Sequence, residues 1–193
     1  IIDLMNASGY DIATLGNHEF DYGMERILEL VEKADYEYIS SNFYHIVDGY
    51  DGNTVLPAIS YATFGDTKIA FVGITTPESF TKSTPAYFQD ENGNYIYGIA
   101  GGDDGAALYK EVQGTIDTVA DEADIIITNP PFSLFREFLA WIMDSEKQFL
   151  IIGSMNSITY KEVFPLVKDN QMLLGNGFSA GNAFFRIIGG AST

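Results

Sequence analysis

The amino-acid sequence predicts an α/β fold, with a mixed sheet flanked by helices. Strand-like apolar runs alternate with amphipathic segments of helical length, which is the order of elements in proteins of this class. One pair of runs, Ile59–Phe64 and Lys68–Ile74, flanks the turn pair Gly65-Asp66 and predicts an antiparallel hairpin within the sheet. With 46% hydrophobic and 19% charged residues, the chain has the composition of a folded globular protein.

The N-terminal segment predicts helix, strand, loop, helix and strand in turn. Ile1–Ser8 is amphipathic and precedes Gly9, a residue type that commonly ends helices. Asp11–Leu15 is a short apolar strand that leads into a loop. Met24–Lys33 places apolar residues at helical spacing, and Tyr36–Ser40 follows as a strand.

Beyond the hairpin, Pro77–Asn94 is rich in turn residues and predicts a long surface excursion. Asp103 or Asp104 can cap a helix that runs to about Glu122. Strands and helices then alternate again: strand Asp124–Thr128, helix Leu134–Asp144, strand Phe149–Ile152, helix Tyr160–Lys168, and strands Met172–Leu174 and Ala183–Ile188.

Charge is distributed unevenly along the chain, whose net charge is −17. Residues 1–123 hold 21 acidic and 5 basic side chains, whereas residues 124–193 hold 6 and 5. An acidic surface repels phosphate backbones, which argues against nucleic-acid binding by the first region, and solubility is the simpler interpretation of the acid. The sequence therefore predicts two regions, 1–123 and 124–193.

Cysteine usage and hydropathy exclude several classes of protein. The absence of cysteine excludes disulfides, thiolate metal sites and thiol nucleophiles. No apolar run approaches the roughly 18 residues that a transmembrane helix requires, so no membrane partner is predicted.

A motif near the N-terminus points to phosphate-ester chemistry. Tyr10–Gly23 contains Gly16-Asn17-His18-Glu19-Phe20-Asp21, and Ser41-Asn42-Phe43 and Val72–Pro77 follow it. Together these residues resemble the calcineurin-like metallophosphoesterases, and in particular their 5′-nucleotidase branch. The resemblance covers roughly residues 1–123.

That resemblance implies a site where two divalent metal ions of the Mn, Zn or Mg type clamp a nucleotide or other phosphate ester and deliver a bridging hydroxide. Asn17 would bind one of the metal ions. His18 would stabilise the transferring phosphoryl group or protonate the leaving oxygen, and Glu19 would orient its imidazole. For an isolated Asn-His pair, a turn cap and a hydrogen-bonded loop histidine are the simpler interpretation, but the surrounding residues favour the shared origin.

The rest of the implied ligand set does not match this chain. The family also requires an Asp-x-His motif, a Gly-Asp loop, a Gly-His loop and a Gly-His-x-His motif. The chain has only two histidines, His18 and His45, and His45 matches none of these motifs. We therefore expect the phosphoesterase site to be incomplete within this chain.

A second motif begins near residue 123. The strand-like Ala123–Thr128 leads into Asn129-Pro130-Pro131-Phe132, and Phe149–Gly153 and Ile158–Phe164 follow. These residues resemble the adenine-specific methylases of the EcoRI modification type, over roughly residues 118–188. The resemblance implies part of a Rossmann-like fold.

Adenine methylation requires acceptors for the hydrogens of the exocyclic amino group. By resemblance, the Asn129 side-chain oxygen and the Pro130 carbonyl would accept them, and Phe132 would stack on a base flipped out of DNA. S-adenosylmethionine would be the methyl donor. An ordinary Pro-Pro turn with Phe132 packed inward fits a bare Asn-Pro-Pro-Phe equally well.

The cofactor loop of such a methylase is not evident. Gly98–Gly105 is the only glycine-rich candidate, and it matches no nucleotide-binding spacing, so we interpret it as a turn with a helix cap. Few basic residues are available to bind DNA.

The sequence thus predicts a partial metallophosphoesterase-like part joined to a partial methylase-like part. The join lies in the strand Ala123–Ile127, which both families would accept. The leading function is a metal-dependent phosphoesterase of the 5′-nucleotidase type, incomplete and inactive as the isolated chain. The alternatives are a fragment of an N6-adenine-specific DNA methyltransferase and a catalytically silent chimera.

Overall fold

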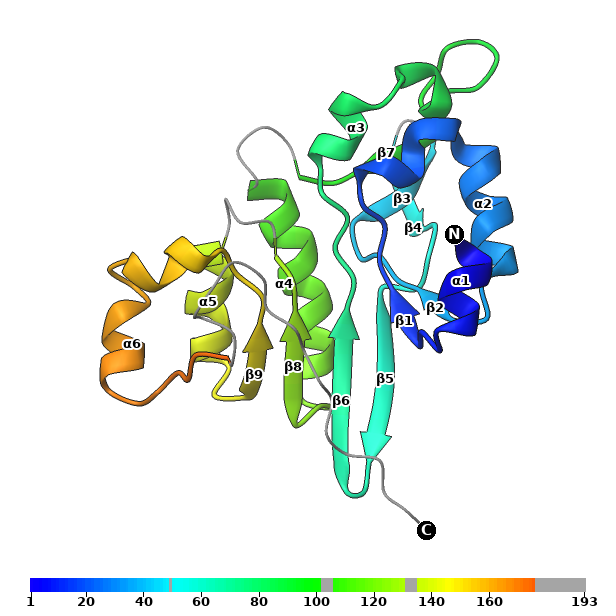
Figure 1. Ribbon diagram of the computed structural model, residues 1–193. Helices are drawn as coiled ribbons and strands as arrows, with labels where there is room; N and C mark the ends of the chain where they lie inside the picture. Colours follow the sequence, from blue (N-terminus) through cyan, green and yellow to red (C-terminus); the bar gives the residue numbers. More distant parts are fainter. Residues whose placement is uncertain (49, 102–105, 131–134, 176–193) are drawn as a thin grey trace. The chain divides into compact units, whose positions relative to one another are not determined.

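The computed structural model describes residues 1–48, 50–101, 106–130 and 135–175 (Figure 1). The chain forms two compact units, Ile1–Ile152 and Gly153–Thr193. Helices and three sheets alternate along the described residues, and the largest sheet contains both parallel and antiparallel pairs. The predicted α/β class with a mixed sheet is therefore confirmed.

The first unit contains most of the regular structure. Its helices are α1 (Ile2–Ala7), η1 (Asn17–Tyr22), α2 (Met24–Lys33), α3 (Glu78–Lys82), η2 (Pro85–Phe88), α4 (Ala106–Ala120) and α5 (Phe135–Asp144). Its strands are β1 (Ile12–Ala13), β2 (Glu37–Tyr38), β3 (Phe43–Val47), β4 (Tyr50–Thr54), β5 (Ile59–Phe64), β6 (Thr67–Val72), β7 (Tyr97–Ile99), β8 (Ile125–Thr128) and β9 (Gln148–Ile151).

The largest sheet has the strand order β5-β6-β8-β9. The predicted hairpin is confirmed: β5 and β6 are antiparallel, and Phe64 pairs with Thr67 across the two-residue turn. Gly65 has φ +61 in that turn, a conformation that glycine adopts without strain. β6, β8 and β9 are parallel and lie side by side in Figure 1.

One face of this sheet is covered by α4 and α5. Ala70 of β6 lies opposite Ile126 of β8, so both side chains point to the same face. They share a buried cluster with Phe138 of α5 and with four residues of α4. The α4 residues follow one another at helical spacing and are Leu108, Val112, Ile116 and Val119. A strand of the phosphoesterase-like region thus pairs directly with a strand of the methylase-like region, over one common core.

Two smaller sheets carry the N-terminal elements. β1 and β2 form a parallel pair, and β3 lies between β4 and β7 in an antiparallel sheet. A second buried cluster joins these elements, with Phe20, Phe43 and Phe88 at its centre. The Phe20 ring lies 5.6 Å from that of Phe43 and 5.4 Å from that of Phe88.

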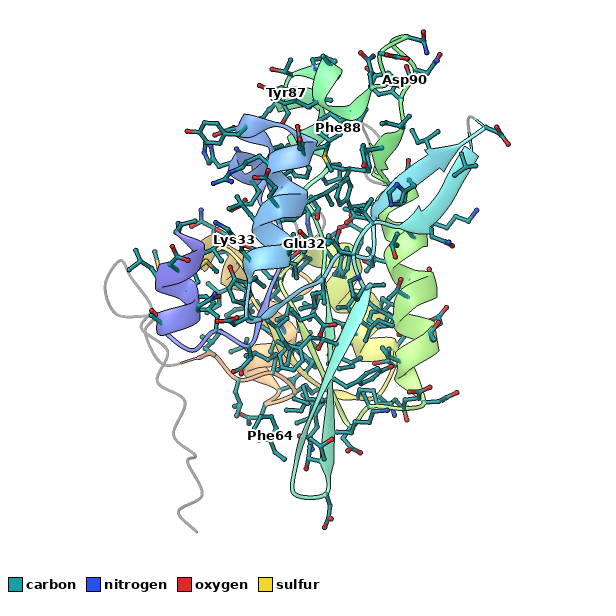
Figure 2. All side chains as sticks on the ribbon, turned by 90° about the vertical axis from the view of Figure 1, so that its right-hand side faces the viewer. Glu32, Lys33, Phe64, Tyr87, Phe88 and Asp90 are labelled. Carbon is teal, nitrogen blue, oxygen red and sulfur yellow. The ribbon has the colours of Figure 1, made fainter. Side chains whose placement is uncertain are left out.

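The predicted surface excursion over Pro77–Asn94 is only partly a surface feature. It forms α3 and η2, and Phe88 is fully buried because it packs between Phe20 and Phe80. Figure 2 shows the contrast with Phe64, which lies at the end of the β5–β6 hairpin and is 64% exposed. Aromatic packing between distant segments thus overrides the local turn signals.

The second unit is described as far as residue 175 and contains η4 (Met155–Thr159) and α6 (Phe164–Lys168). The helix predicted over Tyr160–Lys168 is shorter, since Pro165 lies in its first turn, where proline favours a helix start. Met172–Leu174 is not a strand. Asp103, Asp104 and the strand predicted over Ala183–Ile188 lie outside the described residues.

Across the described ranges, no helix combines the length and the hydropathy needed to cross a bilayer.

Candidate functional site

The phosphoesterase motif folds into a turn at the carboxyl end of β1. Leu15 and Phe20 flank the turn and are 2% and 0% exposed, whereas Asn17, His18 and Glu19 between them are exposed. Burial of the two apolar side chains fixes both ends of the turn against the aromatic cluster. The three candidate residues are therefore presented to solvent from an anchored backbone.

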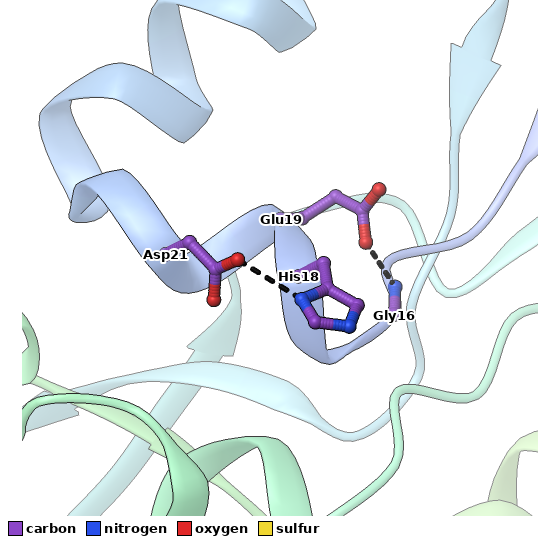
Figure 3. A network of polar contacts seen from close by, with 4 residues as sticks. All are labelled: Gly16, His18, Glu19 and Asp21. Atoms are coloured by element: carbon purple, nitrogen blue, oxygen red, sulfur yellow. Dashed lines mark hydrogen bonds and ion pairs between the residues drawn. The ribbon is translucent and has the colours of Figure 1, made fainter.

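His18 is paired with Asp21 within this turn, as Figure 3 shows. Nδ1 of His18 lies 2.9 Å from Oδ2 of Asp21, with side-chain exposures of 83% and 52%. An ionised carboxylate can only accept, so His18 donates from Nδ1. Because both side chains are exposed, this contact adds at most about 1 kcal/mol to stability, and its main effect is to orient the imidazole.

Glu19 has a different partner from the one that the sequence suggested. Its Oε2 accepts a hydrogen bond of 2.8 Å from the backbone N–H of Gly16, which closes the turn as the Glu half of a capping box does (Figure 3). Asp21, rather than Glu19, contacts the His18 ring. The sequence analysis missed Asp21, although its three-residue spacing from His18 is a signal for side chains on one helical face.

The metal site implied by the resemblance is not assembled by the described residues. Among them, no group of three His, Cys, Asp or Glu side chains lies close enough together to bind a metal ion. His45, the second histidine, is in β3, where its ring lies 5.1 Å from that of Tyr97. Asn17 is one neutral oxygen donor, and two divalent metal ions require several more. The donor set on this part of the chain therefore does not fit a two-metal centre.

The methylase motif follows β8, the middle strand of the parallel set. Asn129 is exposed at the carboxyl end of this strand, and Pro130 is buried. Thr128, which precedes them, is 2% exposed, and its Oγ1 has no hydrogen-bond partner among the residues that the structure describes. Phe132 lies outside the described residues.

The glycine-rich candidate for cofactor binding is not placed like a cofactor loop. Gly98 lies in β7, which pairs antiparallel with β3 in a different sheet from β8. A Cβ atom at Gly101 would collide with the Pro77 ring, so this glycine permits close packing inside the protein. The described residues therefore do not fit S-adenosylmethionine at this stretch.

The clear pKa shifts lie outside the candidate residues. The hydrogen bond from Lys68 lowers the pKa of Glu122, and hydrogen bonds from Asn94 lower that of Asp90. Burial raises the pKa of Tyr61 and, together with the hydrogen bond to Tyr36, that of Tyr38. Each shift follows from contacts within the fold, so none identifies a catalytic group.

Comparison with known proteins finds both resemblances. The family model for the adenine-specific methyltransferase EcoRI matches residues 110–190. The type II methyltransferase M.EcoRI of Escherichia coli is 59% identical over 54 residues, which are 28% of this chain and 17% of that protein. A snake venom 5′-nucleotidase from Gloydius brevicauda is 34% identical over 98 residues, 47% of this chain and 16% of that protein. This one chain is similar to both kinds of protein.

A solved structure extends the likeness of the fold. The calcineurin-like phosphoesterase YfkN from Bacillus subtilis superposes with a TM-score of 0.57 at 21% identity, over 79% of this chain and 46% of that one. Residues 1–123 make up less than two thirds of the chain, whereas the superposition covers 79% of it. The fold shared with the phosphoesterase therefore includes part of the methylase-like region. The chain spans less than a fifth of the length of the two curated relatives above.

Proposed function

We propose that this chain carries part of a metal-dependent phosphoesterase of the 5′-nucleotidase type, which acts on nucleotides or related phosphate esters. The observation that carries this proposal is the turn of Figure 3. In it, the Asp21 carboxylate is hydrogen-bonded to the His18 ring, and the Glu19 carboxylate accepts from the backbone N–H of Gly16. The 5′-nucleotidase relative and the phosphoesterase fold support it.

In this proposal His18 acts through Nε2. When protonated, the imidazolium donates a hydrogen bond to a phosphoryl oxygen or gives its proton to the leaving oxygen, and the Asp21 carboxylate stabilises the positive charge. Asn17 would bind one metal ion. Because the described residues lack the other donors, we further propose that residues 1–193 alone do not hydrolyse phosphate esters and that other polypeptide supplies the remaining ligands.

Transplantation of the turn tests this proposal. Residues 10–23 would replace the matching segment of an active 5′-nucleotidase, and release of phosphate from AMP would be measured. We expect the hybrid to remain active, and His18→Ala within it to lower the rate by about 10²–10⁴-fold. Asp21→Asn should lower it by about 10–100-fold, as expected for a residue that orients another.

The control within the transplanted segment is Asp11→Asn, because the Asp11 side chain is exposed and lies outside the turn. It should leave the rate unchanged. A folded hybrid whose rate is the same with and without the His18 imidazole would refute the proposed role of this turn.

The alternative function is N6-adenine methylation. The observation that favours it is the exposed Asn129 at the end of the central parallel strand, within residues 110–190, which the family model for the adenine-specific methyltransferase EcoRI matches. It predicts saturable binding of S-adenosylmethionine and methyl transfer to adenine that is lost in Asn129→Ala. Absence of binding at millimolar cofactor in a calorimetric titration would eliminate this function for the chain.

A further inference from the structure

The segment between β2 and β3 joins all three sheets of the first unit. The N–H of Ile39 donates to Ala13 O of β1 at 2.9 Å, and the N–H of Ser40 donates to Pro57 O beside β5 at 2.8 Å. The N–H and Oγ of Ser41 both donate to Gly73 O, beside β6, at 2.8 and 2.7 Å. Backbone hydrogen bonds of one short segment thus fix the sheets to one another.

Asn42 is the centre of this segment and is fully buried. Its Nδ2 donates to Thr75 O at 2.7 Å and to Ala100 O at 3.0 Å, and its Oδ1 accepts from Thr75 N–H at 2.8 Å. The backbone O of Asn42 accepts from Ala100 N–H at 2.8 Å. Every donor of the side-chain amide is therefore used, which makes the arrangement specific.

Neighbouring residues reinforce the same point. The Ser40 and Thr75 hydroxyls are 2.7 Å apart, and both residues are fully buried. A Cβ atom at Gly73 would collide with the backbone of Ile39, so only glycine allows the two segments to approach this closely. We call Ser40, Ser41, Asn42 and Thr75 the polar knot. These side chains satisfy one another and nearby backbone groups inside an otherwise apolar interior.

The polar knot reaches the His18 turn through two links. Thr75 is adjacent to Ile74, whose carbonyl accepts a hydrogen bond from Thr14 Oγ1 at 3.3 Å. In the second link, the N–H of Ile39 donates a hydrogen bond to the backbone O of Ala13. Ala13 and Thr14 lead directly into the turn that begins at Gly16. The root of the turn is thus held from both sides by segments that Asn42 connects.

We propose that Asn42 is a positioning residue for the Asn17–His18 turn. Its side-chain hydrogen bonds go to Thr75 and Ala100, and Ile74, the neighbour of Thr75, accepts the hydrogen bond from Thr14. The significance of this role for hydrolysis depends on the proposed function, whereas the structural coupling does not. An apolar residue of the same size would fill the space but would leave Thr75 N–H, Thr75 O and Ala100 O unpaired.

Nuclear magnetic resonance of the full chain tests this coupling without any turnover. The variants are Asn42→Leu, which keeps the side-chain volume, and Thr14→Val, which removes only the last link and is mild enough to fold. The matched control is Phe138→Leu, which weakens the other cluster. The signals observed are the Gly16 amide, which is bonded to Glu19, and the His18 ring nitrogens.

We expect hydrogen exchange of the Gly16 amide to accelerate at least about tenfold in Asn42→Leu. Loss of the buried hydrogen bonds of Asn42 costs more than about 1.4 kcal/mol, which corresponds to that factor. Thr14→Val should shift the His18 ring signals, and Phe138→Leu should change neither readout. The proposal is overturned if Thr14→Val leaves the His18 ring signals unchanged. It is also overturned if Phe138→Leu accelerates exchange of the Gly16 amide as much as Asn42→Leu does. Failure of the transplanted turn to support hydrolysis would refute the proposed function and leave this result standing.

Discussion

The His18 turn and the Asn129 loop differ in how much of their chemistry is local. In the turn, Gly16 to Asp21 provide the side-chain contacts of His18 and Glu19, and distant segments hold only the residues that lead into the turn. In the loop, Asn129 is exposed at a strand end. The methyl donor would have to be held elsewhere, but Gly98 of the glycine-rich stretch lies in β7, which belongs to a different sheet. The contacts of the turn thus involve consecutive residues, whereas a methylase site at Asn129 would require groups from separated segments.

Residues 124–152 of the methylase-like region nevertheless belong to the same compact unit as the phosphoesterase-like region. β6 from the phosphoesterase-like region pairs with β8 from the methylase-like region, with Ala70 opposite Ile126. Buried parallel strands of α/β proteins are near-continuous runs of apolar residues and resemble one another between families. A strand from another family can therefore pair with β6 at this position of the sheet. The division at residue 123 remains a prediction from resemblance, and the compact unit extends to Ile152.

The largest expected effect comes from separating the regions. A chain that ends at residue 123 would lose β8, α5 and β9, and with them Ile126 and Phe138 of the shared core. We expect it to lack a cooperative thermal transition, since the edge of β6 that pairs with β8 would have no partner strand. Circular dichroism and proton NMR measure this. A cooperative melt of residues 1–123 would show that the regions are independent.

The next effect separates the two buried clusters. Phe20→Ala and Phe138→Ala should each lower the free energy of unfolding by about 3–5 kcal/mol, because both rings are almost fully buried. Only Phe20→Ala should also broaden the signals of the His18 ring, since Phe20 anchors that turn. Chemical denaturation and NMR measure the two effects. Equal broadening in both variants would contradict the local character of the turn.

A smaller effect is expected at the start of the Asn129 loop. Thr128→Val replaces a buried hydroxyl, which has no hydrogen-bond partner within the described ranges, by a methyl group of similar size. Removal of this unsatisfied group should leave stability unchanged or raise it by up to about 1 kcal/mol. Destabilisation by more than 1 kcal/mol, measured by urea denaturation, would mean that Thr128 has a hydrogen-bonding role.

The smallest effect concerns the ion pair beside the junction. Lys68 Nζ lies 3.1 Å from Glu122 Oε2, and this contact lowers the carboxyl pKa from its ordinary value of 4.5. A lowered carboxyl pKa stabilises the folded protein above pH 4.5, and this contribution is lost as the pH falls through the folded-state pKa. Glu122→Gln should therefore be slightly less stable at pH 7 and equal to the wild type in acid. A stability difference that persists in acid would assign the effect to packing.

Local patterns in the sequence were sufficient to predict several elements. Met24–Lys33 is a helix with the predicted bounds, and the hairpin turns at Gly65-Asp66, because period and turn chemistry act over neighbouring residues. Long-range features were not accessible. The bonds of Asn42 reach residues 33 and 58 positions away. Phe88 is buried by rings from other segments, which turn residues around it do not reveal.

The candidate site shows the same limit. Asn17, His18 and Glu19 are exposed together on one turn, but the partner of His18 is Asp21, because side-chain direction in the turn decides the contact. The roles of Asn17, His18, Glu19, Asn129 and Pro130 remain predictions, and Phe132 lies outside the described residues.

The central claim is that this chain presents a preformed phosphoesterase turn without a complete site. It is tested most directly by phosphate release from AMP in millimolar Mn²⁺, with residues 1–193, Asn17→Ala and the matched control Asn53→Ala, whose side chain is exposed in β4. We predict that all three proteins release phosphate only at the rate of the protein-free solution. Metal-dependent turnover that is lost in Asn17→Ala and retained in Asn53→Ala would contradict the account.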